Sequence, residues 1–132
     1  MKTQAELRVE ADEWSRKLIG AAIEVHRELG PGLLESAYEE CLCRELDLRE
    51  IPYRRQLPVA IEYKGVVVED AYRIDIFVAN LVIVELKSVE RLDPIFEAQL
   101  ITYLRLTNTW LGLLMNFNVP ILKDGIRRRV LG

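Results

Sequence analysis

Apolar residues recur every three or four positions between residues 5 and 29. This spacing is that of an amphipathic α-helix, so we expect a helix over residues 5–29. Gly30-Pro31-Gly32 ends this helix, because proline cannot continue a helix and glycine readily adopts the conformations that reverse a chain. A second helix is expected over residues 33–48.

The pattern then changes to the alternation of apolar and polar positions that is typical of strands. The expected strands cover residues 57–63, 66–68, 72–78 and 81–86. Lys64-Gly65 has the composition of a hairpin turn. Ala79-Asn80 supplies another tight connection, since asparagine tolerates the left-handed conformation that such turns require.

The last third of the chain returns to a helix, which a buried strand follows. Asp93-Pro94 supplies an N-cap and a first-turn proline, which together open a helix over residues 94–106. Residues 110–117 are nearly all apolar, as in a strand buried on both faces, and residues 121–131 would add an edge strand. Two helices, four strands, a helix and one or two strands predict an α/β (α+β mixed) fold, with a mixed central β-sheet flanked by helices.

Composition agrees with a single folded domain over residues 1–132, since 50% of the residues are hydrophobic and 30% are charged. The formal net charge of -3 excludes a general attraction to nucleic acid or anionic membranes, so a polyanionic partner would need a local basic patch. Basic residues more often form ordinary solvated surface. The candidates for a patch are Arg54, Arg55, Lys64, Arg73, Arg91, Arg105, Arg127, Arg128 and Arg129.

We expect a cytoplasmic protein without membrane association. No apolar run approaches the roughly 20 residues that span a bilayer, and the first 20 residues lack the apolar core of a secretory signal. Cys41 and Cys43 are two positions apart on an expected helix, where they would not face each other to form a disulfide. The chain has one histidine, which argues against a zinc site, so a bound metal would be held by oxygen ligands. We interpret that histidine, His26, as a core residue in preference to a metal ligand.

The candidate chemistry lies on the expected strand over residues 81–86 and just beyond it. Glu85 and Lys87 are two positions apart, so they project to the same side of the sheet. If residues 79–81 form a three-residue loop, Asp75 lies opposite Glu85, with their Cβ atoms about 5 Å apart. A two-residue loop would instead turn Asp75 to the other face, unless a bulge restored the register.

Two adjacent carboxylates on an apolar sheet repel each other and lose hydration, and a divalent cation would remove this cost. Oxygen ligands suit magnesium (Mg2+) or manganese (Mn2+). Beside such a cation, Lys87 would orient or deprotonate a water, or stabilise charge on a phosphate, as in metal-assisted phosphodiester hydrolysis. Glu62 and Lys64 repeat the Glu-x-Lys spacing without a partner aspartate, so we expect only a surface ion pair there.

Three motifs carry a family resemblance. Asp75, separated by nine residues from Glu85-Leu86-Lys87, resembles the D-x(n)-(D/E)-x-K signature of the PD-(D/E)XK nuclease superfamily, with Ile74 where the usual proline would stand. Residues 32–38, which read Gly-Leu-Leu-Glu-Ser-Ala-Tyr, resemble the signature of the GxxExxY family within it. Residues 99–103 resemble the Q-x-x-x-Y motif of its exonuclease-type branches.

The resemblance implies a restriction-endonuclease-like core and a role for each motif residue. Asp75 and Glu85 would hold the metal with help from the carbonyl of Leu86. Glu35 would reach the metal directly or through water, and Lys87 would act on the attacking water. Gln99 and Tyr103 would share a helix face and support the lysine or contact nucleic acid.

Two functions therefore stay open. The first is a Mg2+-dependent (or Mn2+-dependent) nuclease whose partner is nucleic acid, with DNA as the first expectation. The second is a non-catalytic module that uses the same fold to bind nucleic acid or a protein. An exposed edge strand would in addition allow the chain to form a homodimer.

Overall fold

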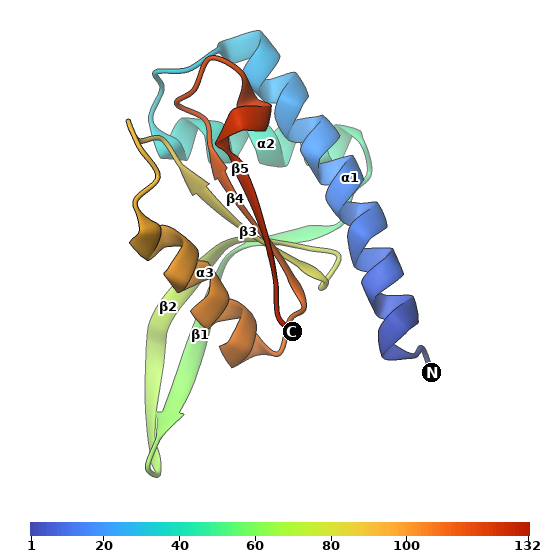
Figure 1. The fold of residues 1–132 in the computed structure, drawn as a ribbon, viewed down its shortest axis with the longest axis vertical. Coiled ribbons are helices and arrows are strands. Elements are labelled where there is room, and N and C mark those ends of the chain that lie inside the picture. The colour runs from blue at the N-terminus through green and yellow to red at the C-terminus, as the bar shows by residue number, and fades with distance from the viewer.

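A mixed five-stranded sheet organises the chain in the computed structural model, which describes residues 1–132 (Figure 1). The helices are α1 (Gln4–Leu29), α2 (Glu35–Leu48) and α3 (Pro94–Thr107), with a short 3-10 helix η1 (Leu122–Gly125). The strands are β1 (Tyr53–Tyr63), β2 (Val66–Val78), β3 (Val82–Lys87), β4 (Leu111–Asn116) and β5 (Ile126–Val130). This α+β arrangement confirms the predicted mixed sheet with flanking helices.

The strands lie in the order β1-β2-β3-β4-β5. Neighbours are antiparallel except for β3 and β4, which are parallel and are connected through α3. Two parallel strands need a crossover of this kind, because the chain must return from the end of the first strand to the end at which that strand began, and a tight turn is too short for that. All six residues of β4 are buried, as expected for a central strand covered on both faces.

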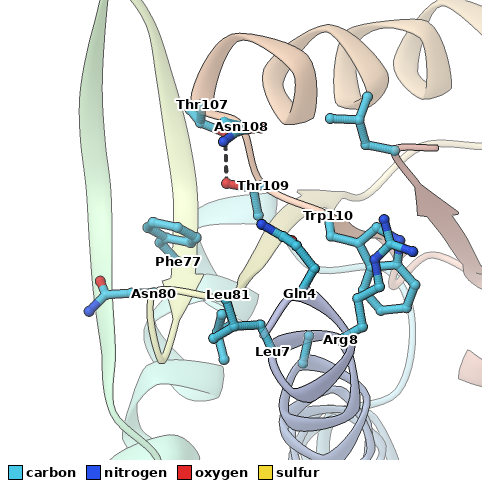
Figure 2. Close-up of a pocket in the computed structure, with 12 residues that line it drawn as sticks. Gln4, Leu7, Arg8, Phe77, Asn80, Leu81, Thr107, Asn108, Thr109 and Trp110 are labelled. Carbon is cyan, nitrogen blue, oxygen red and sulfur yellow. Dashed lines mark hydrogen bonds between the residues drawn. The ribbon is translucent and has the colours of Figure 1, made fainter. Parts of the chain in front are cut away.

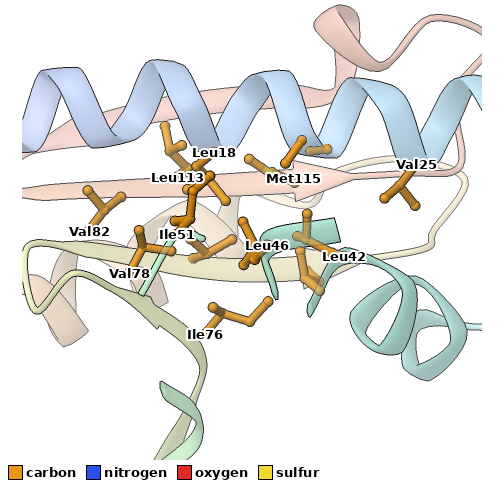
Figure 3. Packing of buried hydrophobic residues seen from close by; sticks show 14 of the residues in the cluster. Leu18, Val25, Leu42, Leu46, Ile51, Ile76, Val78, Val82, Leu113 and Met115 are labelled. Carbon is orange, nitrogen blue, oxygen red and sulfur yellow. The ribbon is translucent and has the colours of Figure 1, made fainter. Parts of the chain in front are cut away.

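Two apolar layers fill the space above and below the sheet. Helices α1 and α2 cover one face, where Leu18, Leu42 and Leu113 belong to the larger cluster (Figure 3). Helix α3 covers the other face through Leu100 and Leu104, which belong to the smaller cluster. Strand β3 contributes side chains to both layers, so its residues must be apolar unless a specific function requires otherwise.

The order of elements differs from the prediction in two respects. The edge strand expected over residues 121–131 is a strand only over β5, because η1 takes up the first part of that range. Residues 66–68 and 72–78 were expected as separate strands, but both belong to β2, so three strands rather than four precede α3. The polar Glu69-Asp70 interrupts the alternation without ending the strand, because the pairing with β1 shifts register between Val59 and Ile61 and Asp70 adopts a positive φ of 51°.

None of the helices combines the length and the apolar character that crossing a bilayer would require. Cys41 and Cys43 are both free thiols, as their spacing predicted.

Gly125, at the end of η1, offers a test of this packing. A Cβ atom at this position would lie 2.2 Å from the carbonyl oxygen of Asn116, so Gly125→Ala should destabilise the protein by about 1 to 3 kcal/mol. Gly20→Ala is the control, because only the flexible Arg49 side chain is near and alanine favours a helix by about 1 kcal/mol. Thermal unfolding should show a lower Tm for the first variant only, and equal values for the first variant and wild type would contradict the packing.

Candidate active site

The β2–β3 turn sets the register of the two strands that carry the candidate residues. Ile76 pairs with Val84 and Val78 with Val82, so the three residues 79–81 form the loop. Ala79 and Asn80 both have positive φ, at 52° and 57°. Of the two loop lengths that the sequence allowed, the structure therefore has the three-residue loop, which brings Asp75 opposite Glu85.

Asp75 takes the place of a backbone partner for β3. Its Oδ2 accepts a hydrogen bond of 2.8 Å from the backbone N–H of Leu86, just beyond the last paired residues of the two strands. Its Oδ1 accepts a longer bond of 3.4 Å from the side-chain amide of Gln56 on β1. The carboxylate is thus held between β1 and β3.

Glu85 is the one acidic residue among the buried side chains, with 8% of its surface exposed. Its Oε1 is buried and has no hydrogen-bond partner. Burial and the neighbouring charge of Asp75 raise the pKa of Glu85 to about 9. A buried carboxyl oxygen without a hydrogen-bond partner is costly, so Glu85 lowers the stability of the folded chain.

Lys87 follows on the same side of β3. Its ammonium lies 4.4 Å from the centre of the Phe96 ring on α3 rather than against a carboxylate. The ring holds the side chain in place through a cation–π contact and leaves the N–H donors of the ammonium available for a ligand.

Glu35 begins α2 beside this group. Partial burial raises the pKa of Glu35, Lys87 opposes the change, and the charges of Asp75 and Glu39 add to it. Glu35 and Asp75 line one open pocket of about 720 Å³, together with Gln56. The structure therefore brings Glu35 into the electrostatic range of both Asp75 and Lys87.

The loop before Glu35 is fixed by two side chains. The hydroxyl of Tyr38 donates to the carbonyl of Gly30 at 2.6 Å and accepts from the N–H of Leu33 at 3.1 Å. The hydroxyl of Ser88, just after β3, donates to the carbonyl of Leu33 at 2.6 Å. Tyr38 in the Gly-x-x-Glu-x-x-Tyr spacing thus has a structural contact that sets where α2 and its Glu35 begin.

The two predicted residues of α3 differ in their placement. The ring of Tyr103 stacks on that of Tyr72, with centroids 4.3 Å apart, and its pKa is raised by burial and by the charges of Glu85 and Asp75. Gln99 is exposed and its side chain makes no hydrogen bond within the protein. Tyr103 belongs to the acidic neighbourhood, whereas Gln99 faces solvent from the same helix.

Three contributors to this region were missed by sequence analysis. Ser88 was given no role, and no local pattern marks it, because its partner is a backbone carbonyl 55 residues away. The hydroxyl of Tyr72 is buried and has no hydrogen-bond partner. Burial, then the neighbouring Tyr103 and then the charge of Glu85 raise the pKa of Tyr72. Gln56 is recognisable only once β1 and β2 are in register.

The remaining candidates lie apart from the site. His26 is buried, and its Nε2 lies 2.8 Å from the carbonyl of Val119, as expected for a core histidine. The surface ion pair expected between Glu62 and Lys64 is wrong, because Lys64 lies in the hairpin turn with a φ of 49° and its ammonium lies 5.3 Å from the centre of the Tyr63 ring. Most arginines of the expected basic patch pair with acidic side chains instead of forming a free cationic surface. These arginines are Arg55, Arg73, Arg127, Arg128 and Arg129.

A second pocket, of about 470 Å³, lies at the opposite end of β3, between the start of α1 and the β2–β3 turn (Figure 2). Trp110 borders it, with the guanidinium of Arg8 5.2 Å from its ring centre. No carboxylate lines this pocket, so it does not offer the chemistry of the acidic site.

Asp75 and Glu85 suit a divalent cation by their chemistry. The unpartnered Oε1 of Glu85 beside a second carboxylate is an oxygen pair that a hard cation would satisfy, whereas zinc favours histidine and cysteine ligands. No group of three or more acidic, histidine or cysteine side chains is arranged to hold an ion. The case for a divalent cation at this site therefore depends on Asp75 and Glu85 alone.

Comparison with known families gives one result. A family model described as the PD-(D/E)XK nuclease superfamily matches residues 12–129, which is most of the chain. No curated protein and no solved structure gave a match.

The pKa of Glu85 predicts a pH-dependent stability in the absence of metal. The unfolded chain loses this proton near the ordinary value of 4.5, whereas the folded chain keeps it to about pH 9. Between these values the folded state binds more protons, so the free energy of unfolding should fall as the pH rises. Glu85→Gln removes this dependence and should be more stable than wild type at pH 7, by on the order of 3 kcal/mol.

Urea unfolding in EDTA from pH 4 to pH 9 measures the effect. The two proteins should approach equal stability at the acidic end, and Glu62→Gln, on the exposed hairpin, should follow wild type throughout. Parallel profiles for wild type and Glu85→Gln would show that the carboxyl group of Glu85 titrates normally.

Proposed function

This chain belongs to the PD-(D/E)XK nuclease superfamily, and on that basis we propose that it is a Mg2+-dependent nuclease that hydrolyses phosphodiester bonds of nucleic acid, with DNA as the first substrate to test. The proposal takes residues 1–132 as one such domain and assigns it to the GxxExxY branch on Gly32, Glu35 and Tyr38. The observation that carries it is the buried Glu85, whose Oε1 has no hydrogen-bond partner, beside Asp75, with Lys87 on the same side of β3.

The metal would be held by Asp75, Glu85 and the carbonyl of Leu86, with Glu35 as a direct or water-mediated partner. When bound, Mg2+ supplies Lewis acidity at the phosphate and lowers the pKa of a coordinated water. Glu85 must release its proton to solvent as it becomes a ligand, so metal affinity should rise with pH up to about 9.

Lys87 has the role closest to the reacting atoms. Its ammonium, held over the Phe96 ring, is near enough to Glu85 for its charge to lower the pKa of that residue, and from this place it would orient the attacking water and stabilise charge on the phosphate. Tyr103 would limit solvent access to Glu85 by its stacking on Tyr72. Gln99 lies one turn before Tyr103 on α3, so its free amide would contact the nucleic acid.

A non-catalytic binding module is the second candidate. It is favoured by the absence of a three-ligand metal cluster and by the pairing of most arginines with acidic side chains. In that case the acidic pair would affect stability alone, and a partner would bind elsewhere on the surface.

Cleavage assays distinguish the two candidates. Labelled single-stranded DNA, double-stranded DNA and RNA are incubated with Mg2+ or Mn2+ and with wild type or Lys87→Ala. Loss of the ammonium should lower the rate by about 100-fold or more, because it would remove one stabilising donor from the transition state.

The chain contains a matched control for this assay. Lys64→Ala removes the lysine of the second Glu-x-Lys sequence on the exposed hairpin, and Glu62→Ala removes its glutamate; both should cleave at the wild-type rate. Equal activity of Lys87→Ala and wild type would exclude the proposed role of the lysine. Folded wild type that cleaves none of the substrates would favour the binding module.

A further inference from the structure

Gln56 has an unusual backbone conformation for a residue within a strand. Its φ is 50°, in the left-handed region that non-glycine residues seldom occupy, although β1 continues on both sides of it. Such a conformation is strained and persists only where the surroundings impose it.

The pairing of β1 and β2 shows what this conformation achieves. Arg55 pairs with Ile76 and Leu57 pairs with Ile74, so the unpaired Gln56 lies opposite Asp75. On one side of this point, Arg55 contacts α2 and Ile76 joins the larger core cluster. On the other side, Leu57 and Ile74 pack in the smaller cluster under α3.

In both strands, therefore, the regular alternation of side chains between the two faces of the sheet is broken at one position. Residues two apart across this position point to opposite faces. Regular strands would point alternate side chains above and below the sheet. Here Gln56 and Asp75 lie at the position of this break, and their side chains meet between the two layers.

The contacts of Gln56 link the candidate metal ligand to α2. Its side-chain nitrogen lies 2.8 Å from Oε1 of Glu39 and 3.4 Å from Oδ1 of Asp75. Both partners are carboxylates, which accept hydrogen bonds when ionised, so the NH2 group must face them. Glu39 is in turn held by the guanidinium of Arg55 at 2.8 Å.

We propose that Gln56 is a positioning residue, which fixes the carboxylate of Asp75 against the N–H of Leu86 so that it faces Glu85 as a metal ligand. A neutral amide suits this role, because it holds the carboxylate without cancelling the charge that attracts a cation. An arginine here would compete with the metal for Asp75. The consequence for metal binding rests on the function proposed above, whereas the orientation of Asp75 does not.

The test uses the full chain and the variant Gln56→Gly. Glycine keeps the left-handed backbone and relieves its strain, while it removes the amide. Lys64→Gly is the matched control, since Lys64 also has a positive φ, of 49°, but lies in the distant hairpin turn. Both variants should be at least as stable as wild type in thermal unfolding, so a change confined to Gln56→Gly would reflect the amide and not the fold.

Two readouts are combined. Hydrogen exchange of the Leu86 amide, measured by NMR without metal and relative to the amide of Leu113, should be at least about 5-fold faster in Gln56→Gly. Calorimetric titration with Mn2+ should give a Kd about 10-fold weaker, as for the loss of other hydrogen-bond partners of metal ligands. Lys64→Gly should match wild type in both. If Gln56→Gly does not fold, Gln56→Asn, whose shorter amide cannot reach both carboxylates, is measured in the same way.

The outcomes separate the two proposals. Wild-type Leu86 exchange in the variant would overturn the positioning role, whatever the metal does. Faster exchange with unchanged Mn2+ affinity would overturn the link between Gln56 and the metal. If wild type binds no Mn2+, the proposed nuclease function fails, and Leu86 exchange alone then decides whether Gln56 positions Asp75.

Discussion

The burial of a carboxyl group in β3 is the constraint to which the rest of the structure responds. β3 lies inside the sheet, and its apolar residues pack against helices on both faces, so the side chain of Glu85 keeps only 8% of its surface exposed to water. Phe96 and Tyr103 of helix α3 lie over this part of β3. The neighbouring strand β2 supplies a second acidic residue, Asp75. A structure selected for stability alone would place a leucine at residue 85.

The extent of sequence-based prediction follows from how local each feature is. The helices and the central strands depend on periodicity and turn composition, which the sequence shows directly. The sequence left two lengths open for the β2–β3 loop, and the place of Asp75 opposite Glu85 follows from the three-residue loop that the structure has. The bulge at Asp70 and the break in side-chain alternation at Gln56 arise from the pairing of β1 with β2, so the sequence of one strand alone does not predict them. Ser88 could not be predicted, because its bond joins segments that meet only in the folded chain.

The distribution of charge bears on how the protein would meet a polyanion. Most arginines are paired with acids on the surface, and such exposed pairs contribute little to stability. Exchanging a carboxylate of the protein for a phosphate would therefore cost little, and the number of phosphates that these arginines neutralise would set how steeply binding weakens with salt concentration. A cationic surface would thus form only when a bound polyanion replaces the acidic partners of these arginines.

The short turn between β2 and β3 has a consequence for the order in which the chain folds. Hairpins with tight turns close in microseconds, whereas the parallel pairing of β3 with β4 must wait for the whole α3 crossover. Asp75 and Glu85 belong to the hairpin, so the two carboxylates would already be neighbours while β4 is still unattached. Their like-charge repulsion would therefore oppose the first pairing of the two strands, before the helices bury Glu85.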